Sequence, residues 1–260
     1  TPSSASRIKA GALSNEDVLR TQVPWASFAN AGIVSREQLE MLYSIDQQQA
    51  EAQVALFHSN GTGYVSLFVD VLTGINKVRE RASSAKLAPA PRTTHACTHL
   101  LATPLSTLAH DLTPLLPLPP SQDDVICYVL AMLDQITEYD VSIASYFVQL
   151  LISTNGAVGP MTPLVKLLGR SSMFIVEKAA SVLAKCLGAP APGASPAVAA
   201  SLSTHLSTFA GWTVGALKEV APSEAAESTK VASAMGGLQS LCSSMTGSAT
   251  THQTHTPSHT

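Results

Sequence analysis

Histidine and cysteine, the residue types that most often bind zinc, gather at two places in the 260-residue chain. The first group lies in the sequence THACTH and the second near the C-terminus; they are His95, Cys97 and His99, and His252, His255 and His259. A structural zinc site needs about four such ligands, held in tetrahedral order by a rigid frame. Neither group lies in a segment with a regular hydrophobic pattern. We therefore expect no metal site at either place.

Other patterns that mark catalytic or cofactor sites are missing from the sequence. Residues 60–64, NGTGY, have the glycines of a phosphate-binding loop but not the lysine that a Walker motif requires, so we expect a turn before a helix there. We find no GxSxG elbow, HExxH motif or paired-carboxylate signature. The sequence predicts that the chain is not an enzyme, with no catalytic, cofactor-binding or metal-ligating residues.

The composition limits the partners and the compartment. Charged residues make up 13% of the chain, and the net charge of −3 provides no basic stripe for nucleic acid. No apolar run approaches the roughly 18 residues of a membrane span, and the first residues, which lack an initial Met, contain no apolar signal segment. The four cysteines are far apart and form no CxxC pair, which predicts reduced thiols in a cytosolic protein; they are Cys97, Cys127, Cys186 and Cys242.

Nearly all of the ordered-looking sequence has the hydrophobic period of an α-helix. In residues 63–80 and again in 123–139 the apolar side chains recur at steps of three and four. Ser35 and Gln38 have the spacing of a capping box, which starts a helix. Further helices are expected at 141–153, 162–186, 197–220 and 227–244. No segment shows the alternating pattern of a strand, so the fold class is all-α.

Similar helices recur about every 53 residues, beginning at Tyr128, Ser181 and Ala234. Helices separated by short Gly, Pro and Ser breaks, such as 188–197, are the arrangement of stacked helical repeats. This spacing is longer than that of a standard two- or three-helix repeat. It therefore supports a solenoid without specifying the repeat.

The tryptophans and one group of charged residues are expected to have structural roles and not catalytic ones. Trp25 and Trp212 lie among apolar residues at helical spacing, which predicts core packing, with an interface anchor as the alternative. A group of charged residues is expected to form a solvated helix face; it consists of Lys166, Glu177, Lys178 and Lys185.

The predicted domain consists of residues 14–80 and 123–245. Residues 81–122 hold seven prolines and no sustained amphipathic period, so we interpret them as a proline-rich, low-complexity, disordered insertion. Residues 1–13 and the Ser/Thr/His-rich tail 246–260 are expected to be disordered.

Residues 162–186 resemble the junction of two armadillo repeats, in which a helix ending in L-V-x-L-L is followed by a polar turn and a second helix. Small Ala179 and Ala180 would let the next helix approach, while Leu183 and Leu187 would fill the core. The resemblance implies a right-handed armadillo/HEAT-like solenoid.

A narrower resemblance is to the N-terminal lobe of the H subunit of the vacuolar-type proton ATPase (V-ATPase). It rests on an ordered set of blocks: VLRTQVPWASFANAGIVSREQLEMLYSID, YVSLFVDVLTGINKVRE, DDVICYVLAMLDQITEYDVSIASYF and MFIVEKAASVLAKC. They cover most of residues 15–80 and 123–188, and 202–245 fits more loosely. Members of that family run from the second block almost directly into the third, whereas 42 residues intervene here.

The resemblance implies a non-catalytic regulatory subunit. Its partners would be the peripheral stalk and catalytic sector of the ATPase, on the cytosolic face of vacuolar and other internal membranes. Full-length members continue into a second lobe that silences hydrolysis, so the chain as written is expected to dock but to inhibit weakly. The resemblance marks no contact residues. The alternative is a general armadillo-type adaptor for extended peptides; against it, neither Trp25 nor Trp212 has the Asn four residues later that such grooves use.

The stretch PLLPLPPSQ, residues 114–122, has a further interpretation. Its codons can form a polypyrimidine tract ending in CAG, as at a splice acceptor, and Arg81-Ala82 is compatible with a donor. Removing 81–122 joins KVRE to DDVICYVL in the family's register. We therefore favour a translated intron, with a lineage-specific loop and a proline-rich ligand as the alternatives.

Overall fold

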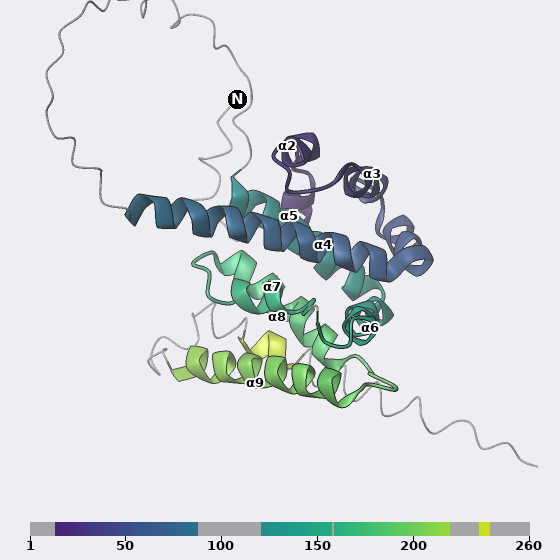
Figure 1. The fold of residues 1–260 in the computed structure, drawn as a ribbon, viewed down its shortest axis with the longest axis vertical. Coiled ribbons are helices and arrows are strands. Elements are labelled where there is room, and N and C mark those ends of the chain that lie inside the picture. The colour runs from purple at the N-terminus through teal and green to yellow at the C-terminus, as the bar shows by residue number, and fades with distance from the viewer. Residues whose placement is uncertain (1–13, 88–120, 158, 219–233, 240–260) are drawn as a thin grey trace, which may run out of the picture.

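The computed structural model describes residues 14–87, 121–157, 159–218 and 234–239; for residues 78–87 it describes the backbone alone. Within these ranges the regular secondary structure is helical and no strand occurs (Figure 1). The predicted all-α class is confirmed. The ends of the chain, 1–13 and 246–260, and most of the proline-rich segment lie outside the described residues.

Apart from the segment between α4 and α5, the helices from α1 to α9 follow one another with short connections. Their bounds are α1 Asn15–Leu19, α2 Trp25–Asn30, α3 Arg36–Ile45, α4 Ala50–Leu87, α5 Gln122–Tyr139, the 3₁₀ helix η2 Val141–Ala144, α6 Ser145–Ser153, α7 Thr162–Leu167, α8 Met173–Gly188 and α9 Pro196–Lys218. Residues 234–239 are also helical.

The helices form layers in chain order, with α5 in the middle. Figure 1 shows α2 and α3 at one end, then α4 with α5 behind it, then α7 and α8, and α9 at the other end. Helix α5 packs against α4 and α1 on one side and against α8 on the other, and α9 packs against α7 and α8. Because α5 has neighbours on both sides, its side chains from Val125 to Leu133 are all buried.

Local signals in the sequence act as expected. The Ser35 hydroxyl accepts the backbone N–H of Gln38 at 3.1 Å, and the Gln38 side chain accepts the backbone N–H of Ser35 at 2.8 Å, so the predicted capping box is confirmed. Asn60, with φ −152° and ψ 56°, interrupts α4. The bend thus lies at Asn60, and residues 61–64 already belong to the helical segment that follows it.

Two helix ends differ from the predicted boundaries of the insertion. Helix α4 continues to Leu87, seven residues beyond the boundary set at residue 80. Helix α5 begins at Gln122 because the Ser121 hydroxyl accepts the backbone N–H of Asp124 at 3.2 Å, while the Asp124 carboxylate accepts the N–H of Ser121. The apolar period did not predict the end of α4 or the start of α5, because the residues at these two ends are mostly polar or small. Between α4 and α5, residues 88–120 are therefore the ones that the structure does not describe.

Two of the cysteines are core residues. Cys127 on α5 and Cys186 on α8 are buried free thiols. Burial raises the pKa of Cys127 to about 12, and burial also raises that of Cys186, so neither forms a reactive thiolate near neutral pH. Cys97 and Cys242 lie outside the described residues.

Candidate partner-binding surface

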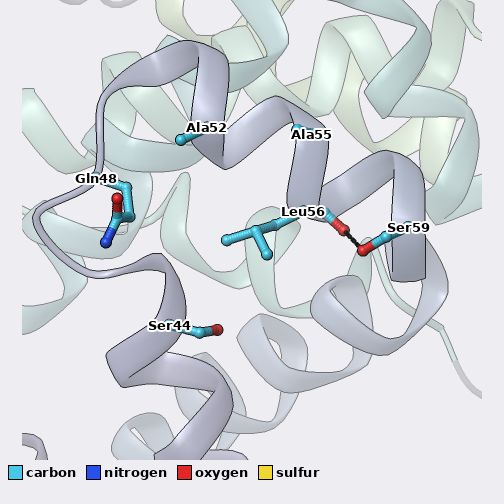
Figure 2. Close-up of a pocket in the computed structure, with 6 residues that line it drawn as sticks. All are labelled: Ser44, Gln48, Ala52, Ala55, Leu56 and Ser59. Atoms are coloured by element: carbon cyan, nitrogen blue, oxygen red, sulfur yellow. Dashed lines mark hydrogen bonds between the residues drawn. The ribbon is translucent and has the colours of Figure 1, made fainter.

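A shallow depression of about 450 Å³ lies between the end of α3 and the start of α4. Apart from one glutamine, its walls are short or apolar side chains; the lining residues are Ser44, Gln48, Ala52, Ala55, Leu56 and Ser59. Figure 2 shows Leu56 pointing from α4 into the space in front of Ser44. Since α3 ends at Ile45 and α4 starts at Ala50, one short connection holds the two walls together.

The hydroxyl groups in this depression are not arranged for catalysis. Ser59 donates to the backbone carbonyl of Leu56 at 2.7 Å (Figure 2), and Ser44 donates to that of Met41 at 2.7 Å. The Tyr64 hydroxyl lies 2.8 Å from the Ser44 oxygen and is left to act as the donor. A nucleophilic serine needs an adjacent base that accepts its proton. The depression therefore offers a contact surface, not a reaction centre.

A second depression of about 280 Å³ lies where α7 meets α8, around Arg170. The guanidinium group of Arg170 lies 3.2 Å from the Asp123 carboxylate and also bonds the side-chain oxygen of Asn76. These contacts tie the α7–α8 turn to α5 and α4. The arginine is thus occupied by neighbours within the fold.

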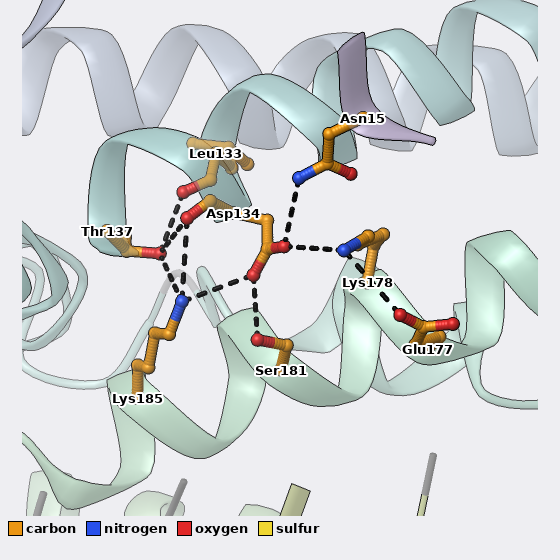
Figure 3. Close-up of polar contacts among 8 residues, drawn as sticks. All are labelled: Asn15, Leu133, Asp134, Thr137, Glu177, Lys178, Ser181 and Lys185. Atoms are coloured by element: carbon orange, nitrogen blue, oxygen red, sulfur yellow. Dashed lines mark hydrogen bonds and ion pairs between the residues drawn. The ribbon is translucent and has the colours of Figure 1, made fainter. Parts of the chain in front are cut away.

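The rigidity behind these surfaces comes partly from a buried carboxylate, Asp134 (Figure 3). Asp134 on α5 is 5% exposed and bonds Lys178, Ser181 and Lys185 of α8 at 2.8, 2.7 and 3.1 Å. Asn15 of α1 reaches the same carboxylate at 3.3 Å. Burial favours the neutral acid, but the charge of Lys185 and the bonds from Lys178 and Ser181 outweigh it, so the pKa of Asp134 is lowered. One side chain therefore joins α1, α5 and α8.

The prediction of a solvated charged face is wrong for its two central lysines. Lys178 and Lys185 are only 16% and 12% exposed because both turn inward to Asp134. Glu177, at 55% exposed, and Lys166 do face solvent. A signal for the cluster was present: Asp134 interrupts the apolar run of residues 125–133 and Ile136, and Lys178, Ser181 and Lys185 are spaced to share one face of another helix. The pairing across helices could not be deduced from one sequence.

A second carboxylate fastens the N-terminal helices to α5. Asp46 accepts the indole N–H of Trp25 at 3.1 Å and a short hydrogen bond from the Tyr128 hydroxyl. Burial and the bond to Asp46 raise the pKa of Tyr128, which keeps it a donor. Trp25 is 1% exposed and packs edge-on against Tyr128. The prediction of core packing is confirmed for Trp25, and Trp212 is partly buried, stacked on Phe209 and packed against the core.

His58 connects α4 to the η2 turn. Its two ring nitrogens lie 2.9 Å from the Asp140 carboxylate and 3.2 Å from the Tyr146 hydroxyl. Burial raises the pKa of Asp140, but hydrogen bonds from Ser142 and His58 lower it by more. A His–Asp pair also occurs in catalytic triads, but here the second nitrogen meets a tyrosine on α6 and not a serine or cysteine. The cluster fixes the orientation of α6 against α4.

No group of three potential metal ligands occurs within residues 14–87, 121–157, 159–218 and 234–239. The histidine- and cysteine-containing groups at 95–99 and 252–259 lie outside these ranges. Among the helices of the described part, none is long and apolar enough to cross a membrane.

Comparison with protein families identifies the chain. The family model for the V-ATPase H subunit, covering the N-terminal domain of that protein, matches residues 12–245. The chain belongs to the V-ATPase H-subunit family. This confirms the resemblance found in the ordered blocks of sequence. No curated protein matches the chain.

Membership in this family indicates the complex and the process in which the chain takes part. Proteins of this family are regulatory subunits of the V-ATPase, so proton transport by that complex is the process to which the chain belongs. The match spans the gap at 88–120 and includes both the α3–α4 depression and the Asp134 cluster. These features are therefore parts of the family's N-terminal domain.

Proposed function

We propose that the chain is a non-catalytic subunit that binds the cytosolic catalytic sector of the V-ATPase at a peripheral stalk and modulates ATP hydrolysis and proton transport. The observation that carries this proposal is the family match across residues 12–245. The proposal places the protein at the cytosolic face of the membranes that contain the pump, held there through the complex.

The layered packing supports a right-handed armadillo/HEAT-type solenoid, which we include in the proposal. Helices α4, α5, α8 and α9 each pack on the next along the stack. Solenoids of this kind present extended surfaces to their partners, because each stacked layer adds its own exposed surface next to that of the layer before it. A surface of this form suits a long stalk better than a small ligand.

We further propose that the α3–α4 depression contributes to the stalk contact. Leu56 supplies an apolar floor, and Ala52 and Ala55 are exposed and small, so a helix of the partner could approach the α4 backbone closely. Tyr43, on the adjacent turn of α3, is 53% exposed and adds apolar area of the kind enriched at interfaces.

Binding of the purified chain to isolated peripheral-stalk subunits of a V-ATPase tests the proposal. We expect binding by the unaltered chain and at least about a tenfold loss with Ala55→Arg, equivalent to about 1.4 kcal/mol. Ala197→Arg, which alters another exposed alanine, on α9, is the matched control and should bind normally. No binding by the unaltered chain would overturn the function; equal binding by both variants would overturn only the α3–α4 contact.

A further inference from the structure

The surface around the α3–α4 depression continues across α4 to the junction of α5 and η2. The α4 residues that line the depression fall within an arc of about 100° on that helix (Figure 2). Glu51 and His58 fall beside this arc, on the side away from α3. The charge of Glu51 raises the pKa of Tyr139, and His58 lies 2.9 Å from the carboxylate of Asp140. The depression and the α5–η2 junction are therefore neighbours on one surface.

This surface has an apolar floor. Tyr43, Tyr139 and Val141 are 53%, 56% and 58% exposed, and they are the three most exposed large apolar side chains among the described residues. Between them, Ala52 and Ala55 are exposed on α4. In Figure 1, α3, the first turns of α4 and then α6 follow one another along one side of the molecule. Large apolar side chains that gather on one side of a protein mark an interaction surface.

Carboxylates border the apolar floor on two sides. On α3, Glu37 and Glu40 are exposed, and Glu40 lies one turn before Ser44 of the depression. On the other side, Glu51 is exposed on α4, and Asp140 lies between the exposed side chains of the α5–η2 junction. We call the floor and its two borders the α3–η2 face.

Cationic side chains are scarce in the elements that form the α3–η2 face. The sequence contains no Lys or Arg within residues 37–76 or 121–165. Arg36, at the start of α3, is 93% exposed and lies 3.8 Å from the carboxylate of Glu40. His58 adds a positive charge only when it is protonated. The face therefore repels anionic partners such as nucleic acid and acidic lipid, and it attracts cationic ones.

We propose that the α3–η2 face binds an amphipathic helix of a V-ATPase stalk subunit, and that this helix carries Lys or Arg on both sides of an apolar stripe. The stripe packs on Leu56 and on the two alanines, Ala52 and Ala55. Small side chains of this kind let two helix axes approach to about 8 Å. The basic side chains on the two borders then reach Glu40 and Glu51.

This inference rests on the proposed function, because it takes the stalk as the source of the helix. It adds the chemistry of the partner and extends the contact from the depression to Val141. Exposed ion pairs contribute little affinity one by one, but together they steer association and select the partner. The apolar floor supplies the contact area, and the carboxylates decide which helix is accepted.

Charge reversal tests the chemistry of the partner. We measure binding of the full chain to isolated peripheral-stalk subunits, with Glu40→Lys and Glu51→Lys combined. Binding should be about tenfold weaker at about 50 mM salt and within about threefold of normal at about 500 mM, because salt screens exposed charges. The control combines Glu16→Lys on α1 with Glu177→Lys on α8, whose side chains are 76% and 55% exposed. It changes the net charge equally and should bind normally.

The outcomes separate this inference from the proposed function. Absence of binding by the unaltered chain would overturn both. Normal binding by the unaltered chain, weakened equally by the two pairs of substitutions or by neither, would overturn this inference alone. An affinity of the unaltered chain that does not fall with salt would also overturn it. Circular dichroism checks that the helices of both variants are intact.

The extension of the face to η2 has its own test. Val141→Ser should weaken binding by about threefold, because the valine loses part of its apolar contact with the partner. Val214→Ser on α9, where the valine is 49% exposed, is the matched control and should bind normally. Equal binding by the two variants would overturn the extension beyond α4.

A second copy of the chain is the other occupant that these variants distinguish. Sedimentation of the chain without stalk subunits should give the monomer mass of 27.1 kDa. A larger mass that the combined Glu40→Lys and Glu51→Lys substitutions return to the monomer value would assign the face to self-association. That result would overturn the proposal.

Discussion

At the scale of single residues, Asp134 has the largest structural role among the described side chains with charge. It lies on α5 and is contacted from α1 and α8, and it supplies a buried counter-charge to two lysines of α8. A buried ion cluster contributes little net stability when intact, because desolvation offsets attraction. Removing one member lowers the stability strongly, because the charged groups that remain are still buried but no longer have an opposite charge beside them.

We therefore expect Asp134→Ala to lower the free energy of unfolding by about 3 kcal/mol, the lower end for a broken buried pair, since Lys178 and Lys185 retain slight exposure. Urea denaturation measures the change. Glu177→Ala, on the exposed side of α8, is the control and should change stability by no more than about 0.5 kcal/mol. Equal effects of the two substitutions would contradict the role given to Asp134.

The same carboxylate makes part of the stability depend on pH. Because the folded pKa of Asp134 lies below the ordinary value of 3.8, its contribution is complete above that pH and is lost as the pH falls through the folded pKa. The stability difference between the unaltered chain and Asp134→Asn should be constant from neutral pH to about pH 5 and shrink in more acidic solution. Denaturation curves at a series of pH values measure it. A difference that persists unchanged at about pH 2 would contradict the lowered pKa.

At the scale of helices, close packing at α4 depends on one glycine after the Asn60 bend. A Cβ on Gly61 would come within 2.4 Å of the ring of Tyr146 on α6. Gly61→Ala should therefore displace the ring and lower the free energy of unfolding by about 1–3 kcal/mol. Thermal and urea denaturation report this change.

The matched control for that prediction is Gly215→Ala on α9. A Cβ there meets nothing within 4 Å, and alanine favours a helix over glycine by up to about 1 kcal/mol. This substitution should leave stability unchanged or raise it. If Gly61→Ala were equally harmless, α6 would not pack against the bend as closely as described.

Sequence patterns predicted the helices better than their contacts. The capped start of α3 and the long apolar runs in α4, α5 and α8 were recognisable because local hydrogen bonds and apolar period set them. The end of α4 at Leu87 was not, because its last residues lie outside the apolar pattern. The inward turn of Lys178 and Lys185 was not, because it depends on Asp134 of another helix. The proposed contact surface between α3 and α4 was not predicted either, because the apolar pattern of each helix does not show how the two helices are inclined to each other.

At the scale of the whole molecule, the segment 88–120 separates two helices that pack on each other, α4 and α5. Replacing its 33 residues by about 12 Gly and Ser residues should leave the helical content intact and raise stability by about 1 kcal/mol, because a shorter loop costs less entropy to close. Circular dichroism and urea denaturation check both. Loss of cooperative unfolding would mean that the segment belongs to the core.

We retain the proposal that 81–122 is translated intron sequence, with a genuine loop or a proline-rich ligand as the alternatives. Peptide mass spectrometry of the endogenous protein distinguishes the first from the other two. A peptide running from Glu80 directly into Asp123 is the expected result. Peptides from within 88–120 would instead establish the segment as part of the protein, which would agree with the use of Ser121 as the cap of α5.

The two tryptophans lie in opposite end regions of the stack: Trp25 in α2, and Trp212 in α9. Trp25 is held against a carboxylate and a tyrosine, whereas Trp212 stacks on Phe209. The molecule thus carries two native fluorophores in different surroundings, one for each end. Replacing either by phenylalanine leaves a single emitter, so that the melting of the first and last layers becomes separately visible without any attached dye.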